Sequence, residues 1–235
     1  MDPVLDRAPA SAAGPPRERP LVEIKNVAVG YTDPTGHRVE VASDLNLTLA
    51  RGEMAYLIGP TGSGKSTILK LLYMDVRPAA GLVRVGPYAS DTAKERDVPH
   101  LRRMLGVVFQ DFQLLPDRSA YENVAFALYA TGVRRREVKE RALKALAAVG
   151  LSHRAKARPS ELSGGEQQRA CVARALVNDP LLMLADEIQK LLVRLHRQGM
   201  ALLMATHDYR LVKAFPARTL ALVRGRLVEV DPESL

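Results

Sequence analysis

The sequence has a single cysteine, no tryptophan and no long apolar run. Cys171 has no second cysteine with which to pair, so a secreted fold held by internal disulfides is excluded. The longest apolar runs, Leu181–Ala185 and Met200–Ala205, are far shorter than the ~18 residues that a membrane-spanning helix requires. The sequence therefore predicts a chain that does not itself cross a membrane.

The first 20 residues lack a basic start, a continuous apolar stretch and any helical or strand period. Prolines are frequent there, and a secretory signal would need the features that are missing. We expect a disordered tail over residues 1–20 and an ordered domain over residues 21–235.

Acidic residues are in the minority: 34 Lys and Arg face 26 Asp and Glu, a net charge of +8. Such an excess fits nucleic acid, an anionic membrane surface or a phosphate-rich ligand. The basic residues are scattered, and small clusters such as residues 134–136 are typical of solvated helix faces. We therefore expect no nucleic-acid partner, although the charge keeps a nucleic-acid-associated protein open as an alternative.

Apolar periodicity predicts an α/β fold. Alternation over Leu21–Val29 and Val39–Leu49 indicates half-buried antiparallel strands. Further strands are expected at Met54–Ile58, Val83–Val85, Gly106–Phe109, Leu181–Ala185 and Ala201–Ala205, with a closing hairpin of Thr219–Val223 and Arg226–Val230 and helices at Ser66–Tyr73, Tyr121–Tyr129 and Arg136–Val149. Strands at both ends that enclose a helical insert predict an α/β core, with antiparallel strands near its start and a helical subdomain at about residues 114–160.

The strongest local signal is a glycine-rich turn between an apolar strand and a helix. It fits the phosphate-binding pattern G-x-x-x-x-G-K-[ST] and consists of Gly59, Pro60, Thr61, Gly62, Ser63, Gly64, Lys65, Ser66 and Thr67. Glycines allow successive N–H groups to face anionic oxygens, and the helix directs its N-terminus at them. We expect Lys65 to reach the β- and γ-phosphates of ATP and Ser66 to bind Mg²⁺.

Two carboxylates follow the apolar strand at residues 181–185. The carboxyl ends of strands are where α/β sheets bind ligands. Asp186 is expected to reach Mg²⁺ through water, and Glu187 is the candidate general base for the attacking water.

Between these motifs stands Leu162-Ser-Gly-Gly-Glu-Gln-Gln-Arg169. Ser163 and Glu166 can form a capping box, as at many helix starts, but Gly164 and Gly165 have no capping function. The segment resembles the signature of the ATP-binding cassette (ABC) ATPases. The resemblance implies the α/β P-loop NTPase fold of an ABC nucleotide-binding domain, with an antiparallel β subdomain and a helical subdomain. It also implies an ATP-hydrolysing homodimer in which Ser163, Gly164, Gly165 and Glu166 face the γ-phosphate bound by the other subunit.

The same resemblance implies roles for three further residues. Tyr31 would stack on adenine, Gln110 would sense Mg²⁺ and the coupling partner, and His207 would contact the γ-phosphate. Taken alone, a strand-end tyrosine or a lone histidine is more often structural. The implied catalytic set is Glu187, His207 and Lys65, and the implied metal ligands are Ser66, Gln110 and Asp186.

Within the family, residues 109–118 and 121–128 are most similar to the cassettes of a bacterial cell-division complex. Lipoprotein-release and macrolide-exporter cassettes share many of these motifs. The resemblance implies a peripheral position on the cytoplasmic face of the inner membrane and an integral membrane subunit whose helix lies beside residues 110–123. Phe112, Leu114, Leu115 and Tyr121 would line that groove or pack in the core.

The chain departs from the family pattern directly after Glu187. The D-loop is missing, and roughly a dozen residues are absent before the helix at residues 188–195, for which Gly199 is the expected stop. Either the sequence omits a segment, which would separate Glu187 and Ile188 by more than a peptide bond, or the protein has lost its D-loop. The second alternative predicts an ATP-gated interaction module with weak hydrolysis.

Overall fold

The computed structural model describes residues 19–32, 35–186, 190–197 and 199–235. The tail expected over residues 1–20 thus lies almost entirely outside the described residues. In chain order the elements are β1 (Val22–Thr32), β2 (Arg38–Leu49), β3 (Met54–Ile58), α1 (Lys65–Leu72), β4 (Ala80–Val85), β5 (Tyr88–Ala89), α2 (Val98–Arg103), β6 (Leu105–Val108), α3 (Ala120–Ala130), α4 (Arg135–Ala148), α5 (Gly164–Leu176), β7 (Leu182–Asp186), α6 (Lys190–His196), β8 (Ala201–Thr206), α7 (Tyr209–Ala214), β9 (Arg218–Val223) and β10 (Arg226–Val230).

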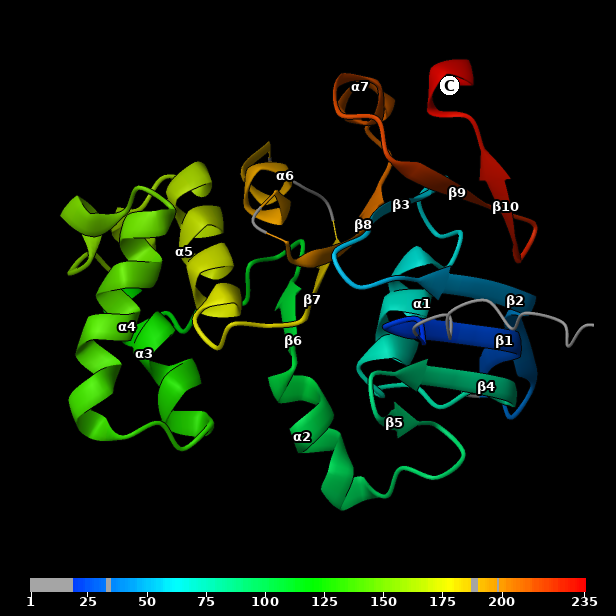
Figure 1. Ribbon diagram of the computed structural model, residues 1–235, viewed down its shortest axis with the longest axis horizontal. Coiled ribbons are helices and arrows are strands. Elements are labelled where there is room, and N and C mark those ends of the chain that lie inside the picture. The colour runs from blue at the N-terminus through cyan, green and yellow to red at the C-terminus, as the bar shows by residue number, and fades with distance from the viewer. Residues whose placement is uncertain (1–18, 33–34, 187–189, 198) are drawn as a thin grey trace, which may run out of the picture.

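A six-stranded sheet in the order β10-β9-β3-β8-β7-β6 forms the centre of the molecule (Figure 1). Strands β9, β3, β8, β7 and β6 run parallel, and β10 pairs antiparallel with β9 as the expected closing hairpin. Strands β3 and β8 are buried along their whole length, which explains their continuous apolar sequences.

Alternate residues of these strands pack into two different cores, as the two-residue period of a strand requires. In β3, Leu57 belongs to the core shared with α1 and the antiparallel strands, whereas Tyr56 belongs to the core shared with the helices. In β8, Leu203 and Met204 divide in the same way. The sheet is therefore covered on both faces.

The first core lies between the central sheet and a second, four-stranded sheet of order β2-β1-β4-β5. Helix α1 is enclosed there and buries four side chains: Ile68, Leu69, Leu71 and Leu72. The predicted antiparallel pairing of the first two strands is confirmed, with Val22 opposite Leu49 and Tyr31 opposite Val39.

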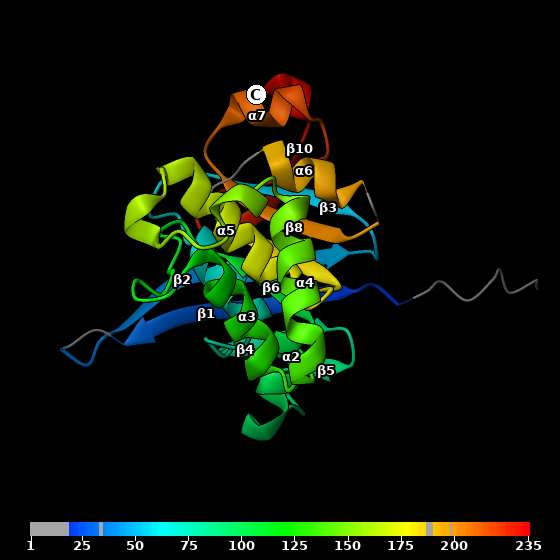
Figure 2. The ribbon, with the colours of Figure 1, turned by 90° about the vertical axis from the view of Figure 1, so that its left-hand side faces the viewer.

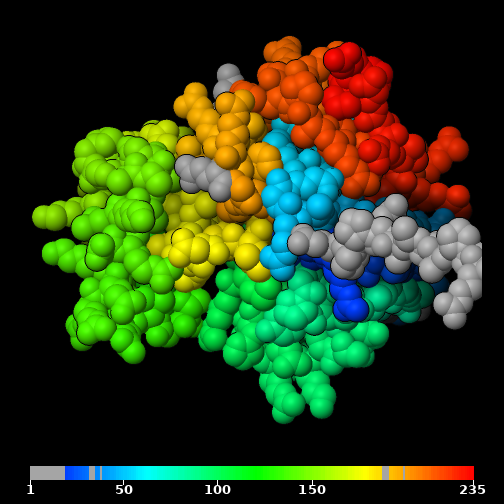
Figure 3. Space-filling model, in the orientation of Figure 1, coloured from blue at the N-terminus to red at the C-terminus, as the bar shows by residue number. Residues whose placement is uncertain are grey.

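On the opposite face, α3, α4 and α5 form a helical lobe beside the core, visible in the turned and space-filling views (Figures 2 and 3). The helices expected from residues 121 and 136 begin one residue earlier, at Ala120 and Arg135. Asn123 is fully buried, and its side chain bonds the carbonyls of Leu115, Arg118 and Ser119. That amide fixes the chain where it enters the lobe.

The crossover between the parallel strands β7 and β8 contains a helix of only seven residues, α6. Gly199 follows it with φ 96°, and its N–H bonds the carbonyl of His196 at 2.8 Å, so the expected helix stop is confirmed. Residues 187–189 lie outside the described residues, and with them Glu187 and the junction proposed after it. Within the described ranges, every helix is too short or too polar to span a bilayer.

Candidate nucleotide-binding site

Four motifs of the sequence meet at one edge of the central sheet. Ile58, the last residue of β3, is in register with Thr206 of β8, and Asp186 of β7 is in register with Ala205. Val108 of β6 lies opposite Ala185. Because parallel strands end at the same edge, the glycine-rich loop, Gln110, Asp186 and His207 are brought together there, at the edge where α/β sheets bind ligands.

The loop after β3 has a backbone that only glycine adopts readily. Gly59, Gly62 and Gly64 have φ of 153°, 80° and 104°. At Gly64 a Cβ would stand 2.7 Å from Cγ1 of Val41, a neighbour on β2. Backbone conformation and close packing thus both require glycine at position 64.

The start of α1 is open toward this loop. Its N-cap is Gly64, which offers no side-chain cap, so the first N–H groups of the helix remain available to an anion. The Ser63 hydroxyl is buried and has no hydrogen-bond partner. Lys65 donates from Nζ to the carbonyls of Gly59 at 2.8 Å and Pro60 at 2.9 Å, so its ammonium lies across the loop. These groups fit a phosphate.

Ser66 and Asp186 join the loop to the neighbouring strand. The Ser66 hydroxyl donates to Oδ2 of Asp186 at 2.5 Å. One hydroxyl and one carboxylate are the protein share of a Mg²⁺ site whose other ligands are phosphate and water. No group of three or more His, Cys, Asp or Glu side chains that could hold a metal alone exists among the described residues. The donor set therefore fits a nucleotide-bound Mg²⁺.

His207 follows β8 in a turn that its neighbours fix. The Thr206 hydroxyl accepts from the N–H of Asp208 at 3.0 Å, and Oδ1 of Asp208 accepts from the N–H groups of Arg210 and Leu211 to cap α7. His207 is exposed at the edge where the loop lies. Its backbone position is consistent with the predicted contact to phosphate.

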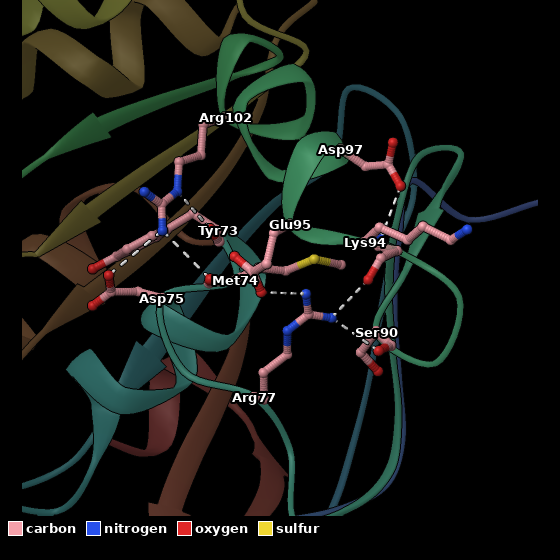
Figure 4. Close-up of polar contacts among 10 residues, drawn as sticks. Tyr73, Met74, Asp75, Arg77, Ser90, Lys94, Glu95, Asp97 and Arg102 are labelled. Atoms are coloured by element: carbon pink, nitrogen blue, oxygen red, sulfur yellow. Dashed lines mark hydrogen bonds and ion pairs between the residues drawn. The ribbon is translucent and has the colours of Figure 1, made fainter.

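Gln110 is exposed, two residues beyond the end of β6. The preceding Phe109 meets the ring of Tyr73 edge-on, with 6.4 Å between centroids. Tyr73 is the C-cap of α1, and Arg102 bonds its carbonyl at 3.0 Å, as Figure 4 shows. Burial raises the pKa of Tyr73, and the carboxylates of Asp75 and Asp186 add to the rise.

Tyr31 is 59% exposed near the tip of the β1–β2 hairpin, where it pairs with Val39. Val41, two residues along β2, packs against Gly64. The ring of Tyr31 is thus presented to solvent on the hairpin that borders the phosphate loop, in agreement with a base-stacking position.

The predicted capping box at Ser163 is confirmed. The Ser163 hydroxyl accepts from the N–H of Glu166, and the Glu166 carboxylate accepts from the Ser163 N–H at 2.9 Å. These bonds to Ser163 lower the pKa of Glu166. The Ser163 hydroxyl also bonds the Glu166 carboxylate at 2.8 Å, and Glu166 forms an ion pair with Arg154. Around Gly164, a Cβ would meet nothing within 4 Å.

The family follows from a comparison with known sequences. A sequence model described as ABC transporter matches residues 42–190. The chain belongs to the ABC transporter family. It is an ABC ATPase, and the resemblance predicted from its motifs is confirmed.

This ABC ATPase is similar to cell division ATP-binding proteins named FtsE. The protein of Streptococcus pneumoniae (serotype 2, strain D39) is 40% identical over 220 residues, which cover 88% of this chain and 94% of the relative. That of Mycobacterium tuberculosis (strain H37Rv) is 45% identical over 197 residues, covering 79% and 86%. The dimeric post-hydrolysis structure of the cassette MJ0796 with ADP and Pi aligns with a TM-score of 0.80 at 30% identity, covering 90% of this chain and 98% of that one.

In these two alignments, about a dozen positions have no counterpart in this chain. The S. pneumoniae alignment has 220 positions, but 88% of 235 residues is about 207, so about 13 positions of the relative have no counterpart here. For M. tuberculosis, 197 positions face about 186 residues, a shortfall of about 11. The shortfall equals in size the segment expected to be absent after Glu187.

Two residues near the site, Asn123 and Arg174, were not predicted from the sequence. Asn123 organises the chain beyond Gln110, and Arg174 of α5 bonds the carbonyls of Phe112 and Gln113. Their partners are backbone atoms, which leave no mark in a sequence. For Asn123, the available signal was that it is the single polar side chain on the buried, otherwise apolar face of α3. Phe112 and Tyr121 are half-buried and pack against the helical core.

Proposed function

We propose that this ABC ATPase is the energy-coupling subunit of a bacterial cell-division complex of the FtsE type. It binds and hydrolyses ATP and transmits the resulting motion to an integral membrane subunit of the FtsX type. The observation that carries the proposal is the joined site at the sheet edge, where Lys65 spans the glycine-rich loop and Ser66 contacts Asp186. Likeness to FtsE proteins over most of the chain supports the cell-division assignment.

In this proposal the loop N–H groups, the α1 N-terminus and Lys65 hold the β- and γ-phosphates. Ser66 and Asp186, with Gln110, would hold a nucleotide-bound Mg²⁺, which would neutralise charge on the phosphates. Tyr31 stacks on the adenine. The buried Ser63 hydroxyl gains a phosphate or loop partner.

Hydrolysis needs a second copy of the chain. The ATP held by one loop is covered by the α5 N-terminus of the partner subunit, where the bare backbone of Gly164 and Gly165 allows close approach. Glu187 orients the attacking water and His207 contacts the γ-phosphate. The dimeric cassette structure that aligns with this chain supports this arrangement.

The remaining assignments follow from the same proposal. Residues 21–235 form the ABC ATPase domain, with a helical subdomain at about residues 114–160. The membrane subunit docks a helix beside residues 110–123, so the ATPase is peripheral on the cytoplasmic face of the inner membrane.

Replacement of the loop lysine tests the core of this proposal. Lys65→Ala should lower ATP turnover by about 100-fold or more, because the charge on the transferring phosphoryl group is no longer offset. Lys70→Ala is the matched control, since Lys70 lies exposed on the same helix. Wild-type turnover in Lys65→Ala would overturn the proposed chemistry.

Two measurements separate the alternatives. Steady-state hydrolysis with and without a co-purified FtsX-type subunit distinguishes a coupled ATPase from an ATP-gated module with weak turnover, the alternative that a genuine loss of the D-loop predicts. Selective co-purification with a lipoprotein-release or macrolide-exporter subunit would instead assign the chain to those complexes.

Glu187→Gln should keep ATP binding, abolish turnover and trap the dimer.

A further inference from the structure

The segment that carries Gln110 makes an unusual turn just after it. Phe112 and Gln113 have φ of 57° and 45°, two successive left-handed residues of which neither is glycine. Residues other than glycine rarely adopt such a conformation, so neighbouring contacts must hold it in place.

One side chain supplies those contacts. Arg174 donates from Nη1 to the carbonyl of Gln113 at 2.6 Å and from Nη2 to the carbonyl of Phe112 at 2.9 Å. The rigid, planar fork of a guanidinium suits two adjacent acceptors, which a lysine ammonium does not reproduce. Arg174 belongs to α5, the helix that Ser163 caps.

The other end of the segment is tied to a different helix. Phe109 packs on Tyr73 at the end of α1, and Arg102 bonds the carbonyls of Tyr73 and Met74 (Figure 4). Gln110 therefore lies between two attachments: Phe109 contacts the end of α1, the helix that follows the phosphate loop, and residues 112–113 are bonded to α5, the signature helix whose N-cap is Ser163.

We propose that Arg174 is a positioning residue for Gln110. It fastens residues 112–113 to α5, so that a displacement of the signature helix relative to the sheet carries Gln110 toward or away from Asp186. The inference rests on the role given to Gln110 in the proposed function and extends it, because it names the side chain that links Gln110 to the face meeting the second subunit.

Arg174→Lys tests the link while keeping the charge. Turnover of Mg-ATP should fall about tenfold with KM within about twofold, because misplacement of Gln110 affects the reaction more than nucleotide binding. Arg174→Gln should lose at least as much turnover. The matched control is Arg141→Lys: Arg141 also bonds a backbone carbonyl, that of Val177 at the C-cap of α5, and in addition the carboxylate of Asp179.

A second readout does not depend on turnover. Cys171 is the single cysteine of the chain, is fully buried, and lies 3.7 Å from Arg174. Its labelling by a thiol reagent should be about fivefold faster or more in Arg174→Lys and unchanged in Arg141→Lys. Because both variants keep their positive charge, a faster rate reports opening between α5 and the loop.

The outcomes separate the two proposals. If the wild-type chain hydrolyses no ATP, the proposed function fails and the labelling rate alone decides the role of Arg174. Unchanged turnover in an active Arg174→Lys, unchanged Cys171 labelling, or equal losses in Arg141→Lys would each overturn the positioning role.

Discussion

Helix α1 begins after a glycine-rich loop, whereas helix α5 itself begins with two glycines, and glycine serves a different purpose in each. At α1 the glycines have left-handed backbones, Gly64 packs against Val41, and no side chain caps the helix. At α5 the glycines lie within the helix, a Cβ would meet nothing within 4 Å at Gly164 and only the end of the Arg169 side chain, at 3.7 Å, at Gly165, and Ser163 and Glu166 form a capping box. The fold therefore requires the glycines before α1, whereas the glycines of α5 are explained by close approach of a ligand or a second subunit.

The largest expected effect separates the two sets most sharply. Gly64→Ala should destabilise the protein by about 2–4 kcal/mol and abolish ATP binding, because it combines a left-handed backbone with a steric clash. Gly132→Ala, at a left-handed glycine with open space in the helical lobe, should cost only about 1 kcal/mol and leave ATP binding intact. Thermal unfolding and nucleotide titration measure both; equal losses of stability would contradict the distinction.

The signature glycines should show the opposite pattern. Gly164→Ala and Gly165→Ala should leave stability unchanged or raise it by up to about 1 kcal/mol, since alanine favours helix. ATP turnover should nevertheless fall about tenfold or more, because a methyl group then stands where the partner-bound phosphate approaches. Full turnover in both variants would show that this face does not meet nucleotide.

A smaller effect tests whether the α5 cap is only structural. Ser163→Ala should cost about 1 kcal/mol. Ser119→Ala removes the same capping box from α3, where Ser119 and Glu122 bond reciprocally, and should cost as much. Only Ser163→Ala is expected to lower ATP turnover further. If the two variants lose turnover equally, the cap acts through stability alone.

The smallest effect concerns pH. Serine hydrogen bonds lower the pKa of both Glu122 and Glu166 below the ordinary value of 4.5. A lowered folded-state pKa contributes stability that is present above pH 4.5 and is lost as pH falls through the folded-state pKa. Glu122→Gln and Glu166→Gln should each flatten the decline in unfolding temperature below pH 4.5. An unchanged acid limb would mean that these carboxylates are not bonded in solution.

The sequence predicted what depends on local pattern. Strand β3, the loop and α1 were placed within one residue, because an apolar run, a glycine pattern and a helical period adjoin there. Helices α2 and α7 were missed, since six residues are too few to display a period. The strand order was also missed, because it depends on pairing between segments far apart in the chain.

The same reasoning applies to the site. Lys65, Ser66 and Asp186 were predictable from motifs, and their meeting follows from parallel strands that end at one edge. Arg174 and Asn123 were not, because they act on backbone carbonyls. Side chains proposed to bind the nucleotide belong to recognisable sequence motifs, whereas side chains that bond backbone carbonyls do not.

The place of β3 in the sheet has a consequence for biosynthesis. Its two neighbours, β8 and β9, are encoded near the end of the chain, and β9 begins about 160 residues after β3 ends. At a translation rate of roughly 5–20 residues per second, the strand that supports the phosphate loop waits roughly 10–30 s for its partners. During that interval the apolar β3 has no sheet to join, and a nascent chain released before β8 emerges from the ribosome would have no ATP site.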